Sequence, residues 1–308
     1  MKMKLPQPFT GIIPPLITPL TDWQTLDVIG LENLVRRLLD GGVHGLFLLG
    51  TCGEGPSLSY ALRREIIDRV AELADDRIPI IVGITDSSLR ESLSMAEYAA
   101  EKGCAGAVLA PPFYHPISQE DLKKYLERLA QHVALPVFLY NMPTHTKVVY
   151  EIDTLKEAFQ NPMYVGLKDS SGDLEYFGQA AQMMKDRPDL TLLIGPEHLL
   201  VPSMKLGGHG GICGGAHLLP KLFVQLYQAV NNRDADAIER MEKRLVSLES
   251  LYNGFEEASF LGNMKCALSI LGICQGGFAE PLHPLPASRI SIIEARLKQL
   301  GITAETLE

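Results

Sequence analysis

The sequence contains few cysteines, and their arrangement suits neither a disulfide framework nor a zinc site. There are five cysteines in 308 residues, an odd number, and no pair has the Cys-x-x-Cys spacing. The eight histidines are scattered along the chain. A disulfide-rich secreted fold and a structural metal site are therefore not expected, and cysteines that remain reduced thiols indicate a cytoplasmic protein.

Long apolar runs and an excess of positive charge are also missing. No segment approaches the ~20 apolar residues that a membrane-spanning helix requires. The first ten residues include lysines but no apolar core, so they do not resemble a secretion signal. The net charge is -9, and there is no run of lysine and arginine to bind phosphate backbones. We therefore expect a partner that is neither a membrane nor a nucleic acid.

What the sequence does contain is a regular alternation of short apolar segments and amphipathic helical patterns. With 46% hydrophobic and 21% charged residues, the composition is typical of a soluble globular protein with a large core. Helix-capping residues precede several of the helical patterns, namely Asp27, Ser59, Ser88 and Ser118. The expected strands are 11–18, 43–49, 78–82, 105–109, 135–140, 164–168, 190–194 and 210–213.

Eight strand–helix units in succession predict an α/β fold, a (β/α)8 TIM barrel with a C-terminal helical extension. A doubly wound open sheet is the alternative, but the Gly-x-Gly-x-x-Gly turn that usually follows its first strand is absent. Three further helical patterns follow at 238–248, 260–268 and 290–300. We expect the barrel to span residues 1–232 and a helical region packed on it to span 233–308.

One of the expected strands ends in a lysine. Lys168 closes strand 164–168, and the alternation of side chains along a strand places Tyr164, Gly166 and Lys168 on one face. Burial disfavours an ammonium group, and a neutral lysine amine can attack a carbonyl and form a Schiff base. The structural alternative is a lysine that reaches solvent at the strand end or pairs with Asp169.

The predicted barrel gathers polar residues that are far apart in the sequence, because active sites of such barrels lie at the carboxyl ends of the strands. Strands five and six are neighbours, so Tyr140 and Lys168 can touch, and a tyrosine beside an amine can shuttle protons during imine formation. The strand-end residues are Thr51, Cys52 and Glu54 after strand two, Tyr114 after strand four, Tyr140 at the end of strand five, and the glycines of 207–215 around strand eight.

Several of these residues have structural alternatives. Tyr140 could be a packing residue whose hydroxyl bonds to backbone. Residues 50–55 could form a tight turn or an anion-binding nest for a carboxylate. The glycines of 207–215 could cradle phosphate or allow close packing of a short strand. Cys52 is expected to be a small buried residue rather than a nucleophile, since no histidine is positioned to activate it.

The loop residues near strands seven and eight include a candidate set of metal ligands. Glu197, His209 and His217 could be combined into a cluster of ligands. Loop residues of this kind are more often solvated, so we expect these three side chains to face solvent and the site to need no metal.

Three motifs, in this order, carry a family resemblance: Gly50-Thr-Cys-Gly-Glu54, Tyr140-Asn-Met-Pro143 and Gly166-Leu-Lys-Asp-Ser-Ser-Gly-Asp173. Together they resemble the dihydrodipicolinate synthase/N-acetylneuraminate lyase family, from about Gly11 through the helical C-terminus. The resemblance implies a barrel with C-terminal helices, usually tetrameric or at least oligomeric. It also implies a class I aldolase, a carbon–carbon or carbon–oxygen lyase without cofactors, whose partners are pyruvate or a related 2-oxo acid and an aldehyde.

The resemblance also implies roles for individual residues. Lys168 would form the Schiff base with the keto carbon, and Tyr140 would shuttle protons to and from the carbinolamine and the aldehyde. Thr51 would relay the proton of Tyr140, and the backbone of Thr51 and Cys52 would hold the substrate carboxylate. Tyr114 would match a tyrosine that dihydrodipicolinate synthases lend across a subunit interface.

Ile212 would match a residue on strand eight that lines the pocket. Two other positions depart from the family pattern. Cys52 stands where threonine is common. His145 stands where dihydrodipicolinate synthases place an arginine that grips the carboxylate of aspartate semialdehyde, and a histidine cannot reproduce that charged, bidentate fork.

The departure at residue 145 bears on the substrate. A mostly neutral imidazole, flanked by Thr144 and Thr146, is suited to hydrogen-bonding hydroxyl groups. We therefore expect a 2-keto-3-deoxy sugar acid or similar 2-oxo acid to be cleaved or formed. The alternatives are 4-hydroxy-tetrahydrodipicolinate synthase, N-acetylneuraminate lyase, a non-catalytic barrel that senses a 2-oxo acid, and a sugar-phosphate isomerase that uses residues 207–215.

Overall fold

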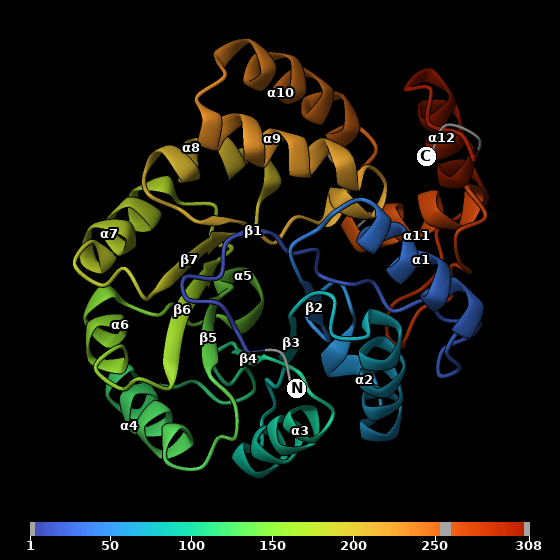
Figure 1. Ribbon diagram of the computed structural model, residues 1–308. Helices are drawn as coiled ribbons and strands as arrows, with labels where there is room; N and C mark the ends of the chain where they lie inside the picture. Colours follow the sequence, from blue (N-terminus) through green and yellow to red (C-terminus); the bar gives the residue numbers. More distant parts are fainter. Residues whose placement is uncertain (1–3, 253–259, 305–308) are drawn as a thin grey trace.

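The computed structural model describes residues 4–252 and 260–304, and its described part is built around a ring of parallel strands (Figure 1). Along the sheet the strands follow the order β1-β8-β7-β6-β5-β4-β3-β2. Their bounds are β1 (Gly11–Ile12), β2 (Leu46–Leu48), β3 (Ile80–Gly83), β4 (Gly106–Leu109), β5 (Val137–Asn141), β6 (Tyr164–Asp169), β7 (Thr191–Ile194) and β8 (Gly210–Gly211).

The ring closes between the segment that follows β1 and strand β2. Pro15 and Phe47 form a parallel bridge. Phe47 N–H donates to the Pro14 carbonyl at 3.0 Å, and Leu16 N–H donates to the Phe47 carbonyl at 2.7 Å. The predicted (β/α)8 barrel is therefore confirmed, and the open-sheet alternative is wrong.

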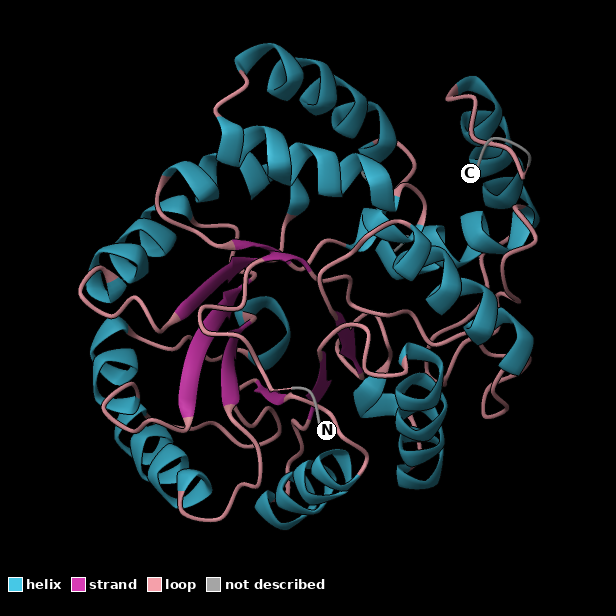
Figure 2. Cartoon of the chain, viewed as in Figure 1, coloured by secondary structure: helices cyan, strands magenta, loops and turns pink. Residues whose placement is uncertain are grey.

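Helices surround the strands on the outside of the ring (Figure 2). Asp27, Ser59, Ser88 and Ser118 each accept a hydrogen bond from the backbone N–H three residues on, so the predicted helix caps are confirmed. The helices of the barrel are α1 (Val28–Asp40), α2 (Tyr60–Ala74), α3 (Leu89–Glu101), α4 (Gln119–Ala130), α5 (Pro143–Thr146), α6 (Ile152–Ala158), α7 (Leu174–Met184), α8 (Leu200–Lys205) and α9 (Pro220–Asn232).

Three more helices follow the barrel: α10 (Ala235–Glu249), α11 (Phe260–Ile270) and α12 (Ala287–Gln299). Helix α10 packs on α9, and α11 packs on α12 beside α1 (Figure 1). The segment after α11 joins the barrel directly, since Gly277 N–H donates to the Leu20 carbonyl at 2.9 Å. No helix in the described ranges combines the length and apolar character needed to cross a membrane.

The first and last strands are shorter than predicted. The sequence favoured a strand over 11–18, but β1 contains only Gly11 and Ile12. Pro14 and Pro15 have no N–H group, so this segment cannot continue a regular ladder of hydrogen bonds. Helix α5 was not predicted, because four residues are too few to show a helical pattern.

The apolar core has two layers, one inside the ring of strands and one between the strands and helices. Tyr164 lies in the outer layer, where its hydroxyl donates to the Leu126 carbonyl at 2.5 Å. Its expected placement on the face of Lys168 is wrong. In the pairing with β5 the register shifts across Val165, which inverts the alternation of side chains at that point.

Candidate active site

Lys168 and Tyr140 lie side by side at the carboxyl ends of β6 and β5. The two residues are paired in the strand register. Lys168 is only 4% exposed, and its Nζ lies 3.9 Å from the centroid of the Tyr140 ring and 4.9 Å from that of Phe47. Tyr140 and Phe47 both belong to the layer inside the ring, so the lysine points into the barrel. An amine is thus enclosed by aromatic rings at the usual catalytic end of this fold.

Asp169 is turned away from this amine and does not pair with it. Asn141 Nδ2 donates to Asp169 Oδ1 at 2.8 Å, and Ser171 Oγ donates to Asp169 Oδ2 at 2.9 Å. Burial raises the pKa of the Asp169 carboxyl, and these hydrogen bonds partly offset that shift. The alternative in which Lys168 is a strand-end lysine paired with Asp169 therefore does not describe this site.

Thr51 is the third polar residue at this point. Its Oγ1 lies 3.4 Å from the Tyr140 hydroxyl, and either group can donate. Thr51 belongs to residues 50–55, which we call the β2 turn. Two non-glycine residues have positive φ angles here: Leu49, just before the turn, at 57°, and Glu54, within it, at 55°. A Cβ at Gly55 would lie 2.1 Å from the Leu49 carbonyl oxygen, so this tight turn requires glycine there.

Backbone N–H groups of the β2 turn remain available to bind a substrate. The turn has internal hydrogen bonds from Glu54 N–H to the Thr51 carbonyl at 3.1 Å and from Gly55 N–H to the Gly50 carbonyl at 3.2 Å. Within residues 4–252 and 260–304, the N–H groups of Thr51 and Cys52 find no acceptor. Adjacent unpaired N–H groups beside a buried amine form a suitable receptor for a carboxylate.

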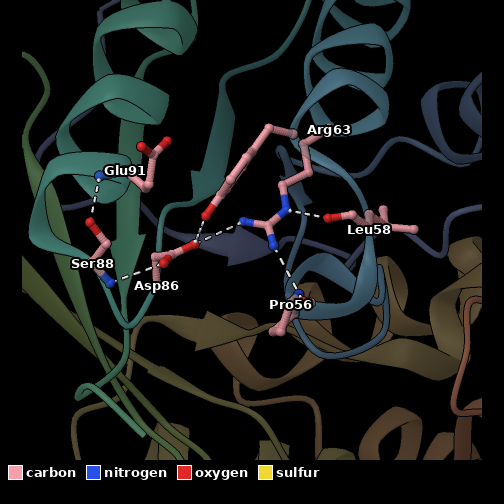
Figure 3. Close-up of polar contacts among 7 residues, drawn as sticks. Pro56, Leu58, Arg63, Asp86, Ser88 and Glu91 are labelled. Carbon is pink, nitrogen blue, oxygen red and sulfur yellow. Dashed lines mark hydrogen bonds and ion pairs between the residues drawn. The ribbon is translucent and has the colours of Figure 1, made fainter. Parts of the chain in front are cut away.

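Arg63 of α2 holds the residues that directly follow this turn (Figure 3). Its guanidinium donates to the carbonyls of Leu58 at 3.0 Å and Pro56 at 3.3 Å, and it forms an ion pair with Asp86 at 3.5 Å. Tyr60 also donates to Asp86, at 2.9 Å. Arg63 is only 8% exposed, so a buried arginine joins the loops that follow β2 and β3. This role cannot be predicted from the sequence, because Arg63 is one of three arginines in an amphipathic helix and looks like a solvent-facing residue.

Glu54 and Lys265 form a fully buried ion pair beneath the same turn. Both side chains are 0% exposed, and they are in direct contact. Lys265 Nζ also donates to the Gly277 carbonyl at 2.6 Å, while Ala279 N–H donates to Glu54 Oε2 at 2.8 Å. Burial lowers the pKa of Lys265, and the Glu54 charge opposes that shift. The sequence held a signal for this pair, since Lys265 is the one charged residue of the apolar helix α11.

Cys52 and Ile212 are weakly polar and apolar residues that follow β2 and β8. Burial raises the pKa of the Cys52 thiol to about 11, against the opposing effect of the Lys168 charge. The thiol is therefore protonated at neutral pH, which does not suit a nucleophile. Ile212, 2% exposed, belongs to the same inner layer as Tyr140.

His145 and Tyr114 lie further out. His145 belongs to α5, which projects onto the barrel opening in Figure 1, and its Nδ1 lies 3.0 Å from Thr144 Oγ1. Partial burial of the imidazole lowers its pKa, as do the charges of Lys147 and Lys168. Tyr114 is 75% exposed and packs edge-on against its neighbour His115, so a single chain does not bring it to the amine.

The expectation that Glu197, His209 and His217 face solvent is wrong, most clearly for Glu197 and His217, which are 6% and 0% exposed. His217 Nε2 accepts from Ile17 N–H at 3.2 Å, and His209 Nδ1 accepts from Leu192 N–H at 3.0 Å. The ring nitrogens of these two histidines thus accept hydrogen bonds from backbone N–H groups that would otherwise need a backbone carbonyl. Within the described ranges, no three His, Cys, Asp or Glu side chains are grouped to hold a metal ion.

The glycines of 207–215 serve close packing rather than phosphate binding. A Cβ at Gly210 would lie 2.0 Å from the Gly11 carbonyl oxygen, and one at Gly214 would lie 2.3 Å from the Phe260 ring. Gly215 N–H donates to Glu197 Oε2 at 2.7 Å. This loop is thus packed against the chain's own carboxyl group, which leaves no support for the isomerase alternative.

Comparisons with known proteins agree with this arrangement. The sequence model of the dihydrodipicolinate synthetase family matches residues 8–300. The chain is 32% identical to a 4-hydroxy-tetrahydrodipicolinate synthase of Methanopyrus kandleri, over 96% of this chain and 97% of the relative.

Two solved structures show the same fold. The dihydrodipicolinate synthase of Bacteroides thetaiotaomicron is 42% identical with a TM-score of 0.92, and the match covers 96% of this chain and 99% of that one. An E. coli K12 prophage protein of the dihydrodipicolinic acid synthase family, solved with pyruvate, is 29% identical with a TM-score of 0.89, again over 96% and 99%. The chain belongs to the dihydrodipicolinate synthetase family of synthases and lyases.

Proposed function

We propose that Lys168 forms a Schiff base with pyruvate, and that the enzyme then makes or breaks a carbon–carbon bond between pyruvate and an aldehyde. The observation that carries this proposal is the enclosed Lys168 amine beneath the Tyr140 ring, next to the unpaired N–H groups of Thr51 and Cys52. Two relatives support the choice of pyruvate: the E. coli protein and a 27% identical synthase of Acinetobacter baumannii were both solved with it.

The first steps use groups within reach of Lys168. Its Nζ attacks C2 of pyruvate while the N–H groups of Thr51 and Cys52 hold the carboxylate. Tyr140 donates a proton to the departing oxygen and Thr51 resupplies it, so that water leaves and an iminium ion forms. Loss of a proton from C3 gives an enamine. The enamine attacks the aldehyde carbonyl, and the reverse sequence cleaves the product.

The exposed position of Tyr114 supports an oligomeric enzyme. A ring that is 75% exposed at the catalytic end of the barrel is available to a neighbouring copy of the chain. In our proposal Tyr114 completes the proton relay of the partner subunit within a homotetramer or homodimer in the cytoplasm. We retain the division into a catalytic barrel over 1–232 and a helical region over 233–308.

The nature of the aldehyde depends on the groups around His145. Since its pKa lies below the ordinary value of 6.5, the imidazole is neutral at neutral pH. The Lys147 ammonium, at the end of α5, donates to the Thr144 carbonyl at 2.7 Å, and a point charge of this kind does not reproduce the bidentate fork of an arginine. Neutral donors and acceptors suit a polyhydroxylated aldehyde, so we propose a 2-keto-3-deoxy sugar acid as the compound cleaved or formed, with Ile212 lining the pocket.

A second candidate is the condensation of pyruvate with aspartate semialdehyde. The names of the Methanopyrus kandleri and Bacteroides thetaiotaomicron relatives favour it. A comparison of kcat/KM distinguishes the two: pyruvate release from a panel of keto-deoxy sugar acids, against condensation with aspartate semialdehyde. Efficient use of aspartate semialdehyde by the unmodified enzyme would overturn our choice of substrate.

Borohydride trapping tests the shared chemistry. Incubation with pyruvate and borohydride should leave a reduced pyruvyl group on the Lys168 peptide, detectable by mass spectrometry. Lys168→Ala should abolish both the adduct and turnover. Lys156→Ala, which removes an exposed lysine of α6, is the matched control and should retain both. An unmodified Lys168 in folded wild-type protein would refute the proposed function.

A further inference from the structure

We propose that Lys265 of α11 is a positioning residue for the substrate carboxylate, acting through Glu54 on the β2 turn. The inference rests on the function proposed above and extends it to the C-terminal helices. Lys265 lies 211 residues from Glu54 in sequence, and their side chains meet with no exposure to solvent.

The geometry of the peptide group connects Glu54 to the carboxylate receptor. In a planar trans peptide, the carbonyl of one residue and the N–H of the next point in opposite directions. Glu54 N–H holds the Thr51 carbonyl and therefore fixes the direction of Cys52 N–H. Gly55 N–H holds the Gly50 carbonyl and likewise fixes Thr51 N–H. Both unpaired N–H groups are thus aimed by donors at residues 54 and 55.

The backbone at residue 54 needs an external restraint. Glu54 has φ 55° and ψ 22°, in the left-handed region that a residue with a Cβ avoids. Such conformations persist where the surroundings impose them, and they cluster at functional sites. Here the Glu54 carboxylate is held by the Lys265 ammonium and by Ala279 N–H, and Thr18 Oγ1 donates to the Gly53 carbonyl at 2.8 Å.

An ion pair provides a restraint that apolar packing does not. A buried pair adds little net stability, since the removal of both charges from water offsets their attraction. The pair does fix the orientation of the Glu54 side chain, because Lys265 Nζ donates both to the Gly277 carbonyl and to the Glu54 carboxylate. We infer that the direction of the Thr51 and Cys52 N–H groups, rather than general stability, is what the pair provides.

The test measures the pyruvate concentration that gives half-maximal borohydride trapping at Lys168. Glu54→Gln keeps the shape of the side chain and removes its charge. Lys265→Met keeps most of the side-chain length. Each variant should raise that concentration about tenfold, as expected for a weakened charge-assisted contact, while trapping at saturating pyruvate is retained. Leu155→Ala is the control for lowered stability, since Leu155 is buried in α6, which packs on α4 and α7.

A second compound separates positioning from general damage. Pyruvamide keeps the ketone but replaces the carboxylate with a neutral amide, so its half-maximal concentration should change less than that of pyruvate in both variants. Equal changes for the two compounds, or the same change in Leu155→Ala, would overturn the inference. If Lys265→Met fails to fold, Glu54→Gln decides alone, because its amide keeps the length of the side chain and one oxygen that accepts from Ala279 N–H or Lys265 Nζ.

The result also separates this inference from the function on which it rests. If folded wild-type protein traps no pyruvate, the proposed function fails and the inference fails with it. If wild type traps pyruvate and Glu54→Gln does so with unchanged half-maximal concentration, the function stands and the positioning role of Lys265 is refuted.

Discussion

Replacing Glu197 with glutamine should change how the stability of this protein depends on pH. Glu197 follows β7 and is 6% exposed. Its Oε2 accepts from Gly215 N–H, whereas its Oε1 is buried without a hydrogen-bond partner in the described part of the chain. Burial, and to a smaller extent the nearby Glu249 carboxylate, raise the pKa of Glu197 from 4.5 to about 8. The folded protein therefore holds a proton here at neutral pH.

The sign and size of the effect follow from that pKa. Between about pH 4.5 and pH 8 the unfolded chain loses the proton while the folded chain retains it, so stability falls as pH rises. Each pH unit in this window lowers the free energy of unfolding by about 1.4 kcal/mol. For this residue the loss from pH 5 to pH 8 is about 4 kcal/mol. Glutamine has no such titration, so Glu197→Gln should be more stable at pH 7 by up to about 3 kcal/mol.

The assay is urea unfolding of both proteins at equal concentration across this pH range. The difference between them reports on residue 197 and its coupling to Glu249, because a separate shifted group such as Asp169 is present in both and cancels. Glu239→Gln is the matched control, since it removes an exposed carboxylate of α10 and should leave the wild-type slope unchanged. Equal pH slopes in wild type and Glu197→Gln would show that the buried carboxyl is not protonated in the folded protein.

Two further predictions concern the reaction. Tyr140→Phe should still form the pyruvate adduct at Lys168 but lose about 10²–10⁴-fold in turnover, the range for a positioned acid–base group; near wild-type turnover would exclude the proton shuttle. His145→Arg should raise kcat/KM for aspartate semialdehyde and lower it for a keto-deoxy sugar acid, because a permanent charge replaces a neutral imidazole; a change in the opposite sense for either substrate would contradict the role given to residue 145.

The sequence was sufficient to predict the barrel, the helix caps and the meeting of Tyr140 with Lys168. Each follows from local periodicity and from the rule that neighbouring parallel strands end at one edge. The alternation of side chains along a strand failed for Tyr164, because a register shift at Val165 is set by the pairing of two strands and leaves no local pattern. Likewise, β1 is short because Pro14 and Pro15 lack the N–H groups that a longer ladder of hydrogen bonds requires.

The buried charged residues around the site are harder to predict from the sequence. A pattern can indicate that Lys265 faces the core of an apolar helix, but not that its partner is Glu54. Arg63 presents the same difficulty, since its acceptors are backbone carbonyls that carry no sequence information. Glu197 was placed in solvent because a loop carboxylate usually lies there, whereas this one is buried against Gly215.

The way in which the substrate carboxylate would be held explains why Cys52 is compatible with the chemistry. If backbone N–H groups bind that carboxylate, the side chain at position 52 contributes packing rather than charge, and a protonated thiol suffices. The side chain at position 145, by contrast, would meet the variable end of the substrate directly. The presence of cysteine instead of threonine at position 52 should therefore leave Schiff-base formation intact. The presence of histidine instead of arginine at position 145 should change which aldehyde the enzyme accepts. The rigid strands and the β2 turn would thus fix the reaction, and helix α5 would select the substrate.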